Sequence, residues 1–250
     1  MAEAEVEVRA RADARLTHQV VVDAVERLTP NMRRIAFEGE ALATLSVPLP
    51  AQWLKVVLPA SHDGTLANRA YTIRHFHPDR RRMEIDFVLH GDAGPASAWA
   101  GSAKVGDVVH LSSPRGGYRV DPDAHWRLLA GDETALPAIA SILDALPVDG
   151  IPTYVVVEVP SLDDVQPLCD SGTTVFQWVA REDSGRVPGH LLQEMIAMLR
   201  LSDARAEVFL AGEATAVKAI KRDLVQRAPL ARIDAKGYWL LGHADHKDKT

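Results

Sequence analysis

The sequence predicts an N-terminal antiparallel six-stranded β-barrel followed by a C-terminal α/β domain with a parallel sheet. Short runs of β-branched and aromatic residues separated by turn residues fill the first half, which is typical of a small barrel. In the second half such runs alternate with segments of helical periodicity, which is typical of a parallel sheet covered by helices. The polar stretch RVDPDAH at 119–125 separates the halves and predicts domains at 15–122 and 123–250.

Six short strands are expected in the first domain, because turn sequences such as TPN, SVPLP, HPDR and VGD punctuate it. In one of these runs Ile85, Phe87 and Leu89 alternate with other residues, so one face of that strand is apolar. The expected strands are 18–25, 32–37, 52–58, 70–75, 83–89 and 107–111.

The second domain is expected to begin with an apolar strand at 126–130. Next, Leu136, Ile139 and Leu143 recur at helical spacing, and Pro147 ends that helix. The runs TYVVVEV, TVFQWVA and AEVFLAG predict further strands, and two more helical patterns follow strands of this set. These elements are the strands 153–159, 174–180 and 206–212 and the helices 190–199 and 214–226.

Composition limits the possible functions. Hydrophobic residues make up 47% of the 250 residues and the formal net charge is −6, which indicates a globular protein and argues against general nucleic-acid binding. The single cysteine, Cys169, excludes an internal disulfide and a four-cysteine iron–sulfur site. His75 and His77 lack a third ligand nearby, so no metal site is expected. Without a long apolar run or a signal-like N-terminus, we expect a cytoplasmic protein with no membrane segment and a loose tail at residues 1–14.

The stretch RAYTIR at 69–74 is the first candidate site. Strand periodicity places Arg69 and Tyr71 on one face, with the hydroxyl of Thr72 next to them. Arginine binds phosphate through a planar set of donors, and tyrosine offers a ring for stacking. The stretch therefore predicts either an ordinary surface strand with a cation–π pair or a binding site for a flat anionic cofactor.

A second candidate, HGDAGPASAWA at 90–100, predicts a turn that opens a helix. Gly94 loosens the turn and Pro95 suits the first helical position. The N–H groups that follow, together with the Ser97 hydroxyl, would then form an anion site suited to a pyrophosphate. The alternative is a short helix that only connects two barrel strands.

Three strand–turn–helix junctions of the second domain form the third candidate. Gly131 ends a strand in LLAGDETALPA, Gly212 ends one in FLAGEATAVKAI, and Arg181 follows one in VAREDSG. Ligands of open α/β sheets bind beyond the carboxyl ends of the strands. These three turns are expected at that one edge, although each taken singly is also consistent with a plain βα turn.

Six stretches of the chain, in their order, resemble the siderophore-interacting proteins. They are RAYTIR, DFVLHGDAGPASAWA, VGDVVHLSSPRGGY, WRLLAGDETALPAI, FLAGEATAVK and KGYW. That family consists of flavin-dependent ferric-siderophore reductases related to the ferredoxin–NADP reductase superfamily. The resemblance runs from about residue 17 to residue 242. It implies a ferredoxin reductase-like fold, FAD on the barrel, and NADPH or NADH on the second domain.

The family's motifs imply roles for particular residues of this chain. The flavin-side set is Arg69, Tyr71, Thr72, Arg74, Asp86, Val88, His90, Gly94, Ala96, Ser97 and Trp99. The nicotinamide-side set is Gly131, Asp132, Thr134, Ala135, Arg181, Gly212 and Glu213. Thr72 and Lys55 are the implied catalytic residues, and Lys55 and Arg115 the implied cations for an anionic ferric siderophore.

The implied activity is reduction of chelated Fe³⁺ to Fe²⁺, which releases iron, by a monomeric enzyme. Two alternatives stay open: a siderophore carrier without turnover, and a flavin reductase that passes electrons to a partner protein. Arg181 matches the position where related reductases hold the 2′-phosphate of NADPH, whereas Glu158 at a strand end favours NADH; of the two, NADPH is the expected donor. Leu240 stands where the family often has arginine, which favours a less anionic chelate.

Overall fold

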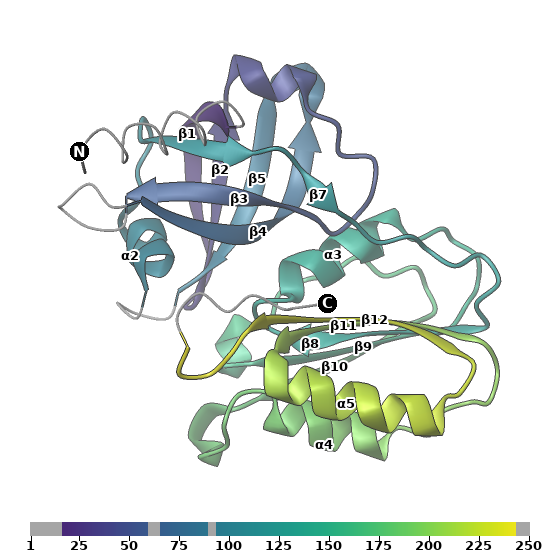
Figure 1. Ribbon diagram of the computed structural model, residues 1–250. Helices are drawn as coiled ribbons and strands as arrows, with labels where there is room; N and C mark the ends of the chain where they lie inside the picture. Colours follow the sequence, from purple (N-terminus) through teal and green to yellow (C-terminus); the bar gives the residue numbers. More distant parts are fainter. Residues whose placement is uncertain (1–16, 60–65, 90–93, 244–250) are drawn as a thin grey trace, which may run out of the picture. The chain divides into compact units, whose positions relative to one another are not determined.

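The computed structural model describes residues 17–59, 66–89 and 94–243 (Figure 1). The expected tail at residues 1–14 and the predicted site residue His90 lie outside the described residues. Contacts divide the chain into two compact units. The first comprises the chain up to Leu28 together with Met32–Gly117, and the second comprises Thr29–Asn31 together with Tyr118–Thr250.

The first unit is the predicted antiparallel six-stranded barrel. Its strands follow the order β4-β5-β2-β1-β6-β3, and a β3–β4 ladder closes the ring, while the two-residue strand β7 adds to β3. The bounds are β1 Thr17–Thr29, β2 Met32–Glu38, β3 Gln52–Pro59, β4 Leu66–His77, β5 Arg82–Val88, β6 Val108–Ser112 and β7 Arg115–Gly116. Two 3-10 turns, η1 Glu40–Thr44 and η2 Pro78–Arg80, and the helix α2 Pro95–Ser102 connect them.

The interior of the barrel is filled by alternate residues of its strands. Leu54, Val56 and Leu58 of β3 are buried, and the residues between them are half-buried. On β5 the predicted apolar alternation is confirmed for Ile85 and Phe87, which are both buried in the same core. Closing the sheet on itself leaves no long edge with unpaired backbone groups, which is why short strands suffice.

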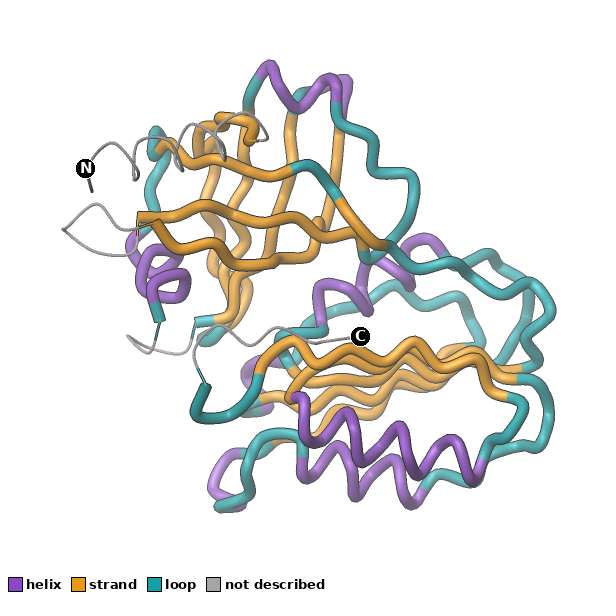
Figure 2. The backbone as a smooth tube through the Cα atoms, in the orientation of Figure 1, coloured by secondary structure: helices purple, strands orange, loops and turns teal. Residues whose placement is uncertain are grey.

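The second unit is the predicted α/β domain, with five parallel strands in the order β10-β9-β8-β11-β12. Helices α4 and α5 lie together on one face of this sheet and α3 lies on the other (Figure 1; strands in orange in Figure 2). The strands are β8 Trp126–Asp132, β9 Thr153–Val159, β10 Thr174–Ala180, β11 Ala206–Glu213 and β12 Ala231–Trp239. The helices are α3 Leu136–Ala145, α4 His190–Met198 and α5 Ala214–Arg227, with the 3-10 turns η3 Leu162–Asp164 and η4 Glu182–Ser184.

Strand β8 is the point at which the strand order changes direction, because β9 and β11 lie on its two sides. In open α/β sheets this switch point is where ligands bind, beyond the carboxyl ends of the strands. Two strands, β7 and β12, were not expected from the sequence. Among the described residues no helix is long and apolar enough to cross a membrane.

Candidate functional site

Arg69 and Tyr71 lie on the core-facing side of β4. In the β3–β4 register, Tyr71 is opposite Leu54 and Arg69 is opposite Val56, and both partners belong to the barrel core. The Tyr71 ring packs on Phe87 with the ring centroids 4.3 Å apart. Burial raises the pKa of the Tyr71 phenol, and the Arg69 charge opposes that rise. The cation and the ring therefore lie on one face, as the motif predicts.

An aromatic cluster extends from Tyr71 to α2. Phe87 lies against Trp99 with the centroids 5.6 Å apart, and Trp99 stacks on Phe37 at 6.4 Å with 11° between the ring planes. These separations are typical of favourable aromatic pairs. Because Trp99 belongs to α2, the cluster fixes the helix against strands β2 and β5.

Thr72 lies on the opposite face of β4 from Tyr71. It is opposite Trp53 in the register, and Trp53 is in turn opposite Arg115 of β7. Directly opposed residues of antiparallel strands project from the same face, and neighbouring strands lie about 5 Å apart. Lys55, two residues after Trp53, projects from that face as well. We call these four residues, Thr72, Trp53, Arg115 and Lys55, the Trp53 face.

Gly116 allows the Trp53 indole to lie close to the β7 backbone. A Cβ at Gly116 would stand 2.7 Å from the indole Nε1, and the residue has a φ of +65°. Both conditions favour glycine, since other residues would clash with the ring and strain the backbone. Gly116, in the SPRGG stretch, therefore allows the Trp53 side chain to take its place on the Trp53 face.

Helix α2 starts at the Gly94–Pro95 pair, as the sequence predicts. Gly94 is the extended residue before the helix and Pro95 is in its first turn. A Cβ at Gly94 would meet no atom of the described residues within 4 Å, so these residues leave space open beside the helix start. At the other end, Arg33 Nη1 donates to the carbonyl oxygens of Ala100 and Gly101, both at 2.7 Å, which places a cation at the negative end of the helix dipole.

Asp86 is paired with Arg34 within the barrel. Nε and Nη2 of Arg34 donate to its two carboxylate oxygens at 2.7 and 2.8 Å, and the two residues are opposite each other in the β2–β5 register. This bidentate pair holds the two strands in register. Of the other flavin-side residues expected from the sequence, Val88, Ala96 and Ser97 are buried and Arg74 is half-buried.

In the second unit, Asp132 is a fully buried hydrogen-bond acceptor at the carboxyl edge of the sheet. Its Oδ1 accepts from N and Oγ1 of Thr134 at 2.9 and 2.5 Å. Its Oδ2 accepts from the N–H of Glu213 at 2.8 Å and from Nε1 of Trp239 at 2.9 Å. Burial and the neighbouring Glu133 carboxylate raise the pKa of Asp132 to about 6, against four donors that favour the charged form.

Two further buried carboxylates cap the helices that follow the strands. Glu158, near the end of β9, accepts from the N–H groups of Gly189 and Leu192 at 2.7 and 2.8 Å, at the start of α4. Glu213, which precedes α5, accepts from the N–H of Ala216 at 2.8 Å. Such N–H groups commonly bind phosphate at helix starts. Here the chain's own acids occupy them.

Arg181 joins two of the acids at this edge. Its guanidinium donates to both carboxylate oxygens of Glu133, at 2.6 and 2.9 Å, and to Oε1 of Glu158 at 2.9 Å. The side chains of Arg181, Glu133 and Glu158 are 13%, 7% and 0% exposed. These hydrogen bonds and charges raise the pKa of Arg181, although its burial alone would lower it.

Gly131 and Gly212 make room for the chain's own atoms. A Cβ at Gly131 would stand 2.4 Å from the Ala211 carbonyl oxygen and 2.5 Å from the Ala135 Cβ. A Cβ at Gly212 would stand 2.5 Å from Oδ2 of Asp132. The two glycines that the sequence places at the switch point therefore allow β8, β11 and a buried carboxylate to approach closely.

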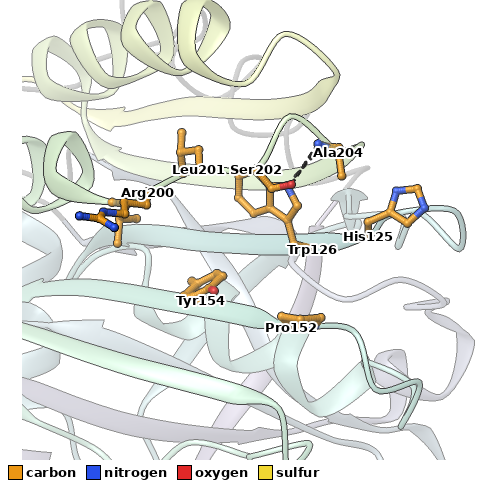
Figure 3. Close-up of a pocket in the computed structure, with 9 residues that line it drawn as sticks. His125, Trp126, Pro152, Tyr154, Arg200, Leu201, Ser202 and Ala204 are labelled. Carbon is orange, nitrogen blue, oxygen red and sulfur yellow. Dashed lines mark hydrogen bonds between the residues drawn. The ribbon is translucent and has the colours of Figure 1, made fainter.

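A hollow of about 250 Å³ lies at the opposite, amino edge of the same sheet (Figure 3). Trp126, Pro152 and Tyr154 line it near the starts of β8 and β9, and residues of the loop between α4 and β11 complete it. The Trp126 Nε1 donates to the carbonyl oxygen of Ala204 at 3.2 Å, which ties that loop to β8. Of the site residues expected from the sequence, none of those that the structure describes lines this hollow.

The two units define the class of the protein: a ferredoxin reductase-like architecture of an antiparallel barrel followed by a parallel five-stranded sheet. The ferredoxin–NADP⁺ reductase of Plasmodium falciparum superposes with a TM-score of 0.65 at 11% identity, over 87% of this chain and 95% of that one. At this identity the likeness concerns the fold alone.

The chain belongs to the siderophore-interacting protein family. The family model for the siderophore-interacting FAD-binding domain matches residues 21–67 and 60–118. The model for the siderophore-interacting protein matches residues 124–242. The siderophore-interacting protein SipS of Aeromonas hydrophila has a TM-score of 0.81 at 27% identity, over 92% of this chain and 93% of that one. The resemblance expected from the sequence is thereby confirmed.

Two relatives show how far the similarity extends. An uncharacterized protein of Mycobacterium tuberculosis is 37% identical over 192 residues, which cover 71% of this chain and 66% of the relative. The alignment thus spans about two thirds of that relative's own length. The ferric vibriobactin reductase ViuB of Vibrio cholerae is 28% identical over 236 residues, which cover 86% of each chain.

Among the described residues, the first unit supplies groups of the kinds that FAD requires: Arg69 and Tyr71 share one face of β4, and no described atom lies within 4 Å of a Cβ at Gly94, at the start of α2. The second unit fits the phosphates of a dinucleotide less well. Its strand order places a switch point at β8, but Asp132, Glu158 and Glu213 already occupy backbone donors at this edge.

Sequence reasoning missed several residues that shape these sites. The sequence predicts no role for Trp53, Glu133, Arg34 or Trp239, although Trp239 donates to Asp132. Glu133 carried a usable signal, because it stands inside the GDETALPA motif next to Asp132. Trp53 and Arg34 carried none, since their partners follow from strand register and not from spacing along the chain.

Proposed function

We propose that this chain is an FAD-dependent reductase that takes electrons from NAD(P)H and reduces the Fe³⁺ of a siderophore to Fe²⁺. The observation that carries the proposal is the Trp53 face, where the predicted catalytic Thr72 and the cations Lys55 and Arg115 project from one side of an FAD-binding barrel. The naming of the relative ViuB as a ferric vibriobactin reductase supports the same chemistry.

Bound FAD accepts electrons in pairs and releases them singly, which is the chemistry needed between a hydride donor and Fe³⁺. The protein's contribution is to bind and orient. We assign phosphate binding to Arg69 and to the α2 N–H groups near Ser97, and stacking to Tyr71. By the family's motif, the Thr72 hydroxyl would hydrogen-bond the reactive edge of the flavin. Because Thr72 leaves β4 on the face opposite Tyr71, this contact requires the flavin to reach both faces at the edge of the strand.

Lys55 and Arg115 would attract a ferric chelate, because deprotonated oxygen ligands give such complexes negative charge. Fe²⁺ binds hard oxygen donors more weakly than Fe³⁺, so electron transfer itself promotes release of the metal. No protein ligand to iron is required. Among the described residues no group of three or more His, Cys, Asp or Glu side chains could hold a metal ion.

The experiment that tests the proposal follows the visible flavin bands of the purified protein under anaerobic conditions. We expect the bands to bleach on addition of NADH or NADPH and to return on addition of a ferric siderophore. A carrier would bind the chelate but show no flavin bands. In a reductase that passes electrons to a partner protein, the flavin bands would bleach and would stay bleached after addition of the ferric chelate.

We also propose that the enzyme is cytoplasmic and monomeric. The cytoplasmic location follows because reduced nicotinamide dinucleotides are supplied inside the cell. Light scattering of the purified protein and fractionation of cells that produce it test these two points. A stable dimer, or a protein recovered outside the cytoplasm, would revise them without changing the proposed chemistry.

A further inference from the structure

Arg181 is the residue of the second unit that matches a 2′-phosphate contact by sequence, but its charge is already compensated. Glu133 accepts two hydrogen bonds from its guanidinium and Glu158 accepts a third. A bidentate arginine–carboxylate pair is among the strongest hydrogen-bonded pairs in proteins. The trio of one guanidinium and two carboxylates therefore presents a net negative charge to the carboxyl edge of the sheet.

Redirecting Arg181 to a ligand would remove the charged partner of two buried acids. Glu133 and Glu158 are 5% and 0% exposed, so water does not replace the guanidinium. Removing one partner of a buried ion pair is strongly unfavourable, because the remaining charge stays buried and unpaired. Glu158 is also fixed by its hydrogen bonds from Gly189 and Leu192 at the start of α4. Arg181 is thus held in place from two sides.

Further acidic residues belong to this edge of the sheet, at the switch point at β8. Glu133 is adjacent in sequence to Asp132, and Asp132 accepts from the N–H of Glu213 at 2.8 Å. A 2′-phosphate carries about two negative charges near neutral pH, like other phosphate monoesters. At this edge it would meet several carboxylates and one guanidinium that is already paired, whereas an unmodified ribose hydroxyl brings no charge.

We infer that the carboxyl edge of the second unit selects against a 2′-phosphate, so that this chain uses NADH in preference to NADPH, with Glu133 as the specificity-determining residue. This inference rests on the proposed function, because it concerns the electron donor of the same reaction. This inference replaces the 2′-phosphate contact that the sequence suggested for Arg181, since the guanidinium pairs with Glu133 and Glu158 and not with the nucleotide.

The first test measures binding and needs no turnover. Isothermal titration of the FAD-loaded protein with 5′-AMP and with adenosine 2′,5′-bisphosphate compares two probes that differ only in the 2′-phosphate. We expect the bisphosphate to bind no more tightly than 5′-AMP. Binding of the bisphosphate about tenfold or more tightly, the size of one favourable charge contact, would overturn the inference. Failure of both probes to bind would overturn it as well.

The second test removes one carboxylate. In Glu133→Gln the side chain keeps its size and one acceptor oxygen, and the guanidinium gains an unpaired donor. We expect affinity for the bisphosphate, and kcat/KM for NADPH, to rise about fivefold to tenfold relative to the AMP and NADH values. The matched control is Glu194→Gln on α4, an exposed acid whose partners are Arg186 and His190, which should leave both ratios unchanged.

These measurements distinguish failure of the NADH inference from failure of the proposed reductase activity. If Glu133→Gln changes the values for both nucleotides by the same factor, the carboxylate acts on the fold and the inference is wrong. If the wild-type protein turns over with NADPH better than with NADH, only the inference falls. If it oxidises neither nucleotide in the presence of a ferric siderophore, the proposed function falls with it.

Discussion

The indole Nε1 of Trp239 donates a 2.9 Å hydrogen bond to Oδ2 of Asp132, which joins the last residue of β12 to the last residue of β8. The two strands are not neighbours, because β11 lies between them. The same oxygen accepts from the Glu213 N–H of β11. One buried carboxylate thus connects the ends of three strands at the edge where the fold class binds nucleotides.

Replacing this carboxylate should destabilise the protein. In Asp132→Asn the amide nitrogen cannot accept, so donors among Thr134, Glu213 and Trp239 lose their partner. At pH 7, where Asp132 is ionised, we expect the free energy of unfolding in urea to fall by about 2–4 kcal/mol, the usual cost of unpaired buried polar groups. Asp203→Asn, at an exposed loop position, is the control and should change stability by less than about 0.5 kcal/mol. Equal stability of the two variants would remove Asp132 as a structural acceptor.

Asp132 should also leave a signature in the pH dependence of stability. Its folded pKa of about 6 lies above the ordinary value near 3.9, so the folded protein binds this proton more tightly than the unfolded chain. The contribution of this group to stability is therefore greatest below about pH 4 and falls by up to about 3 kcal/mol as the pH rises to about 6.

The measurement is the difference in unfolding free energy between the wild-type protein and Asp132→Asn at several pH values. The difference cancels other groups, such as Asp149, whose pKa the hydrogen bonds and charge of Arg127 lower. We expect the advantage of the wild type to shrink from pH 4 to pH 6 and then level off. A constant difference over this range would contradict the raised pKa.

Arg69 should govern retention of FAD without governing the fold. We expect Arg69→Ala to raise the Kd for FAD about tenfold or more, the loss of one arginine–phosphate contact, with unchanged circular dichroism. Arg80→Ala, on the exposed turn η2, is the matched control and should keep its flavin. Unchanged flavin content in Arg69→Ala would remove this residue from the site.

The Trp53 face should recognise the charge of the chelate. We expect Lys55→Ala to raise KM for anionic ferric chelates about fivefold to tenfold and to have little effect on neutral ones, with the difference shrinking in high salt. Lys104→Ala, at an exposed position after α2, serves as the control. If Lys55→Ala lost flavin, or affected neutral and anionic chelates alike, the assignment to substrate would be wrong.

The sequence predicted most of the fold because local patterns specify the elements. Strand alternation, such as Ile85 and Phe87 on β5, and the Gly94–Pro95 helix start were readable without any tertiary information. The edge strand β12 was missed, since its residues are mostly half-buried and give no clear alternation. The two-residue strand β7 is too short to produce a pattern at all.

The candidate sites were less predictable, because their chemistry depends on partners that only the register and the turns bring together. Arg181 alone suggests a phosphate contact, whereas its pairing with Glu133 and Glu158 reverses that suggestion. Likewise, Gly131 and Gly212 suggest a nucleotide turn, while the structure shows that they accommodate neighbouring backbone and the Asp132 carboxylate. Spacing along the chain carries no information about such pairings.

The most direct test of the proposed activity counts electrons. The purified, FAD-loaded protein is mixed anaerobically with NADH, a ferric siderophore and a ferrous-iron trap, and both NADH consumed and Fe²⁺ trapped are recorded. A hydride carries two electrons and each Fe³⁺ accepts one, so the account predicts two trapped Fe²⁺ for each NADH oxidised. Trapped iron no higher than in the protein-free mixture would contradict it.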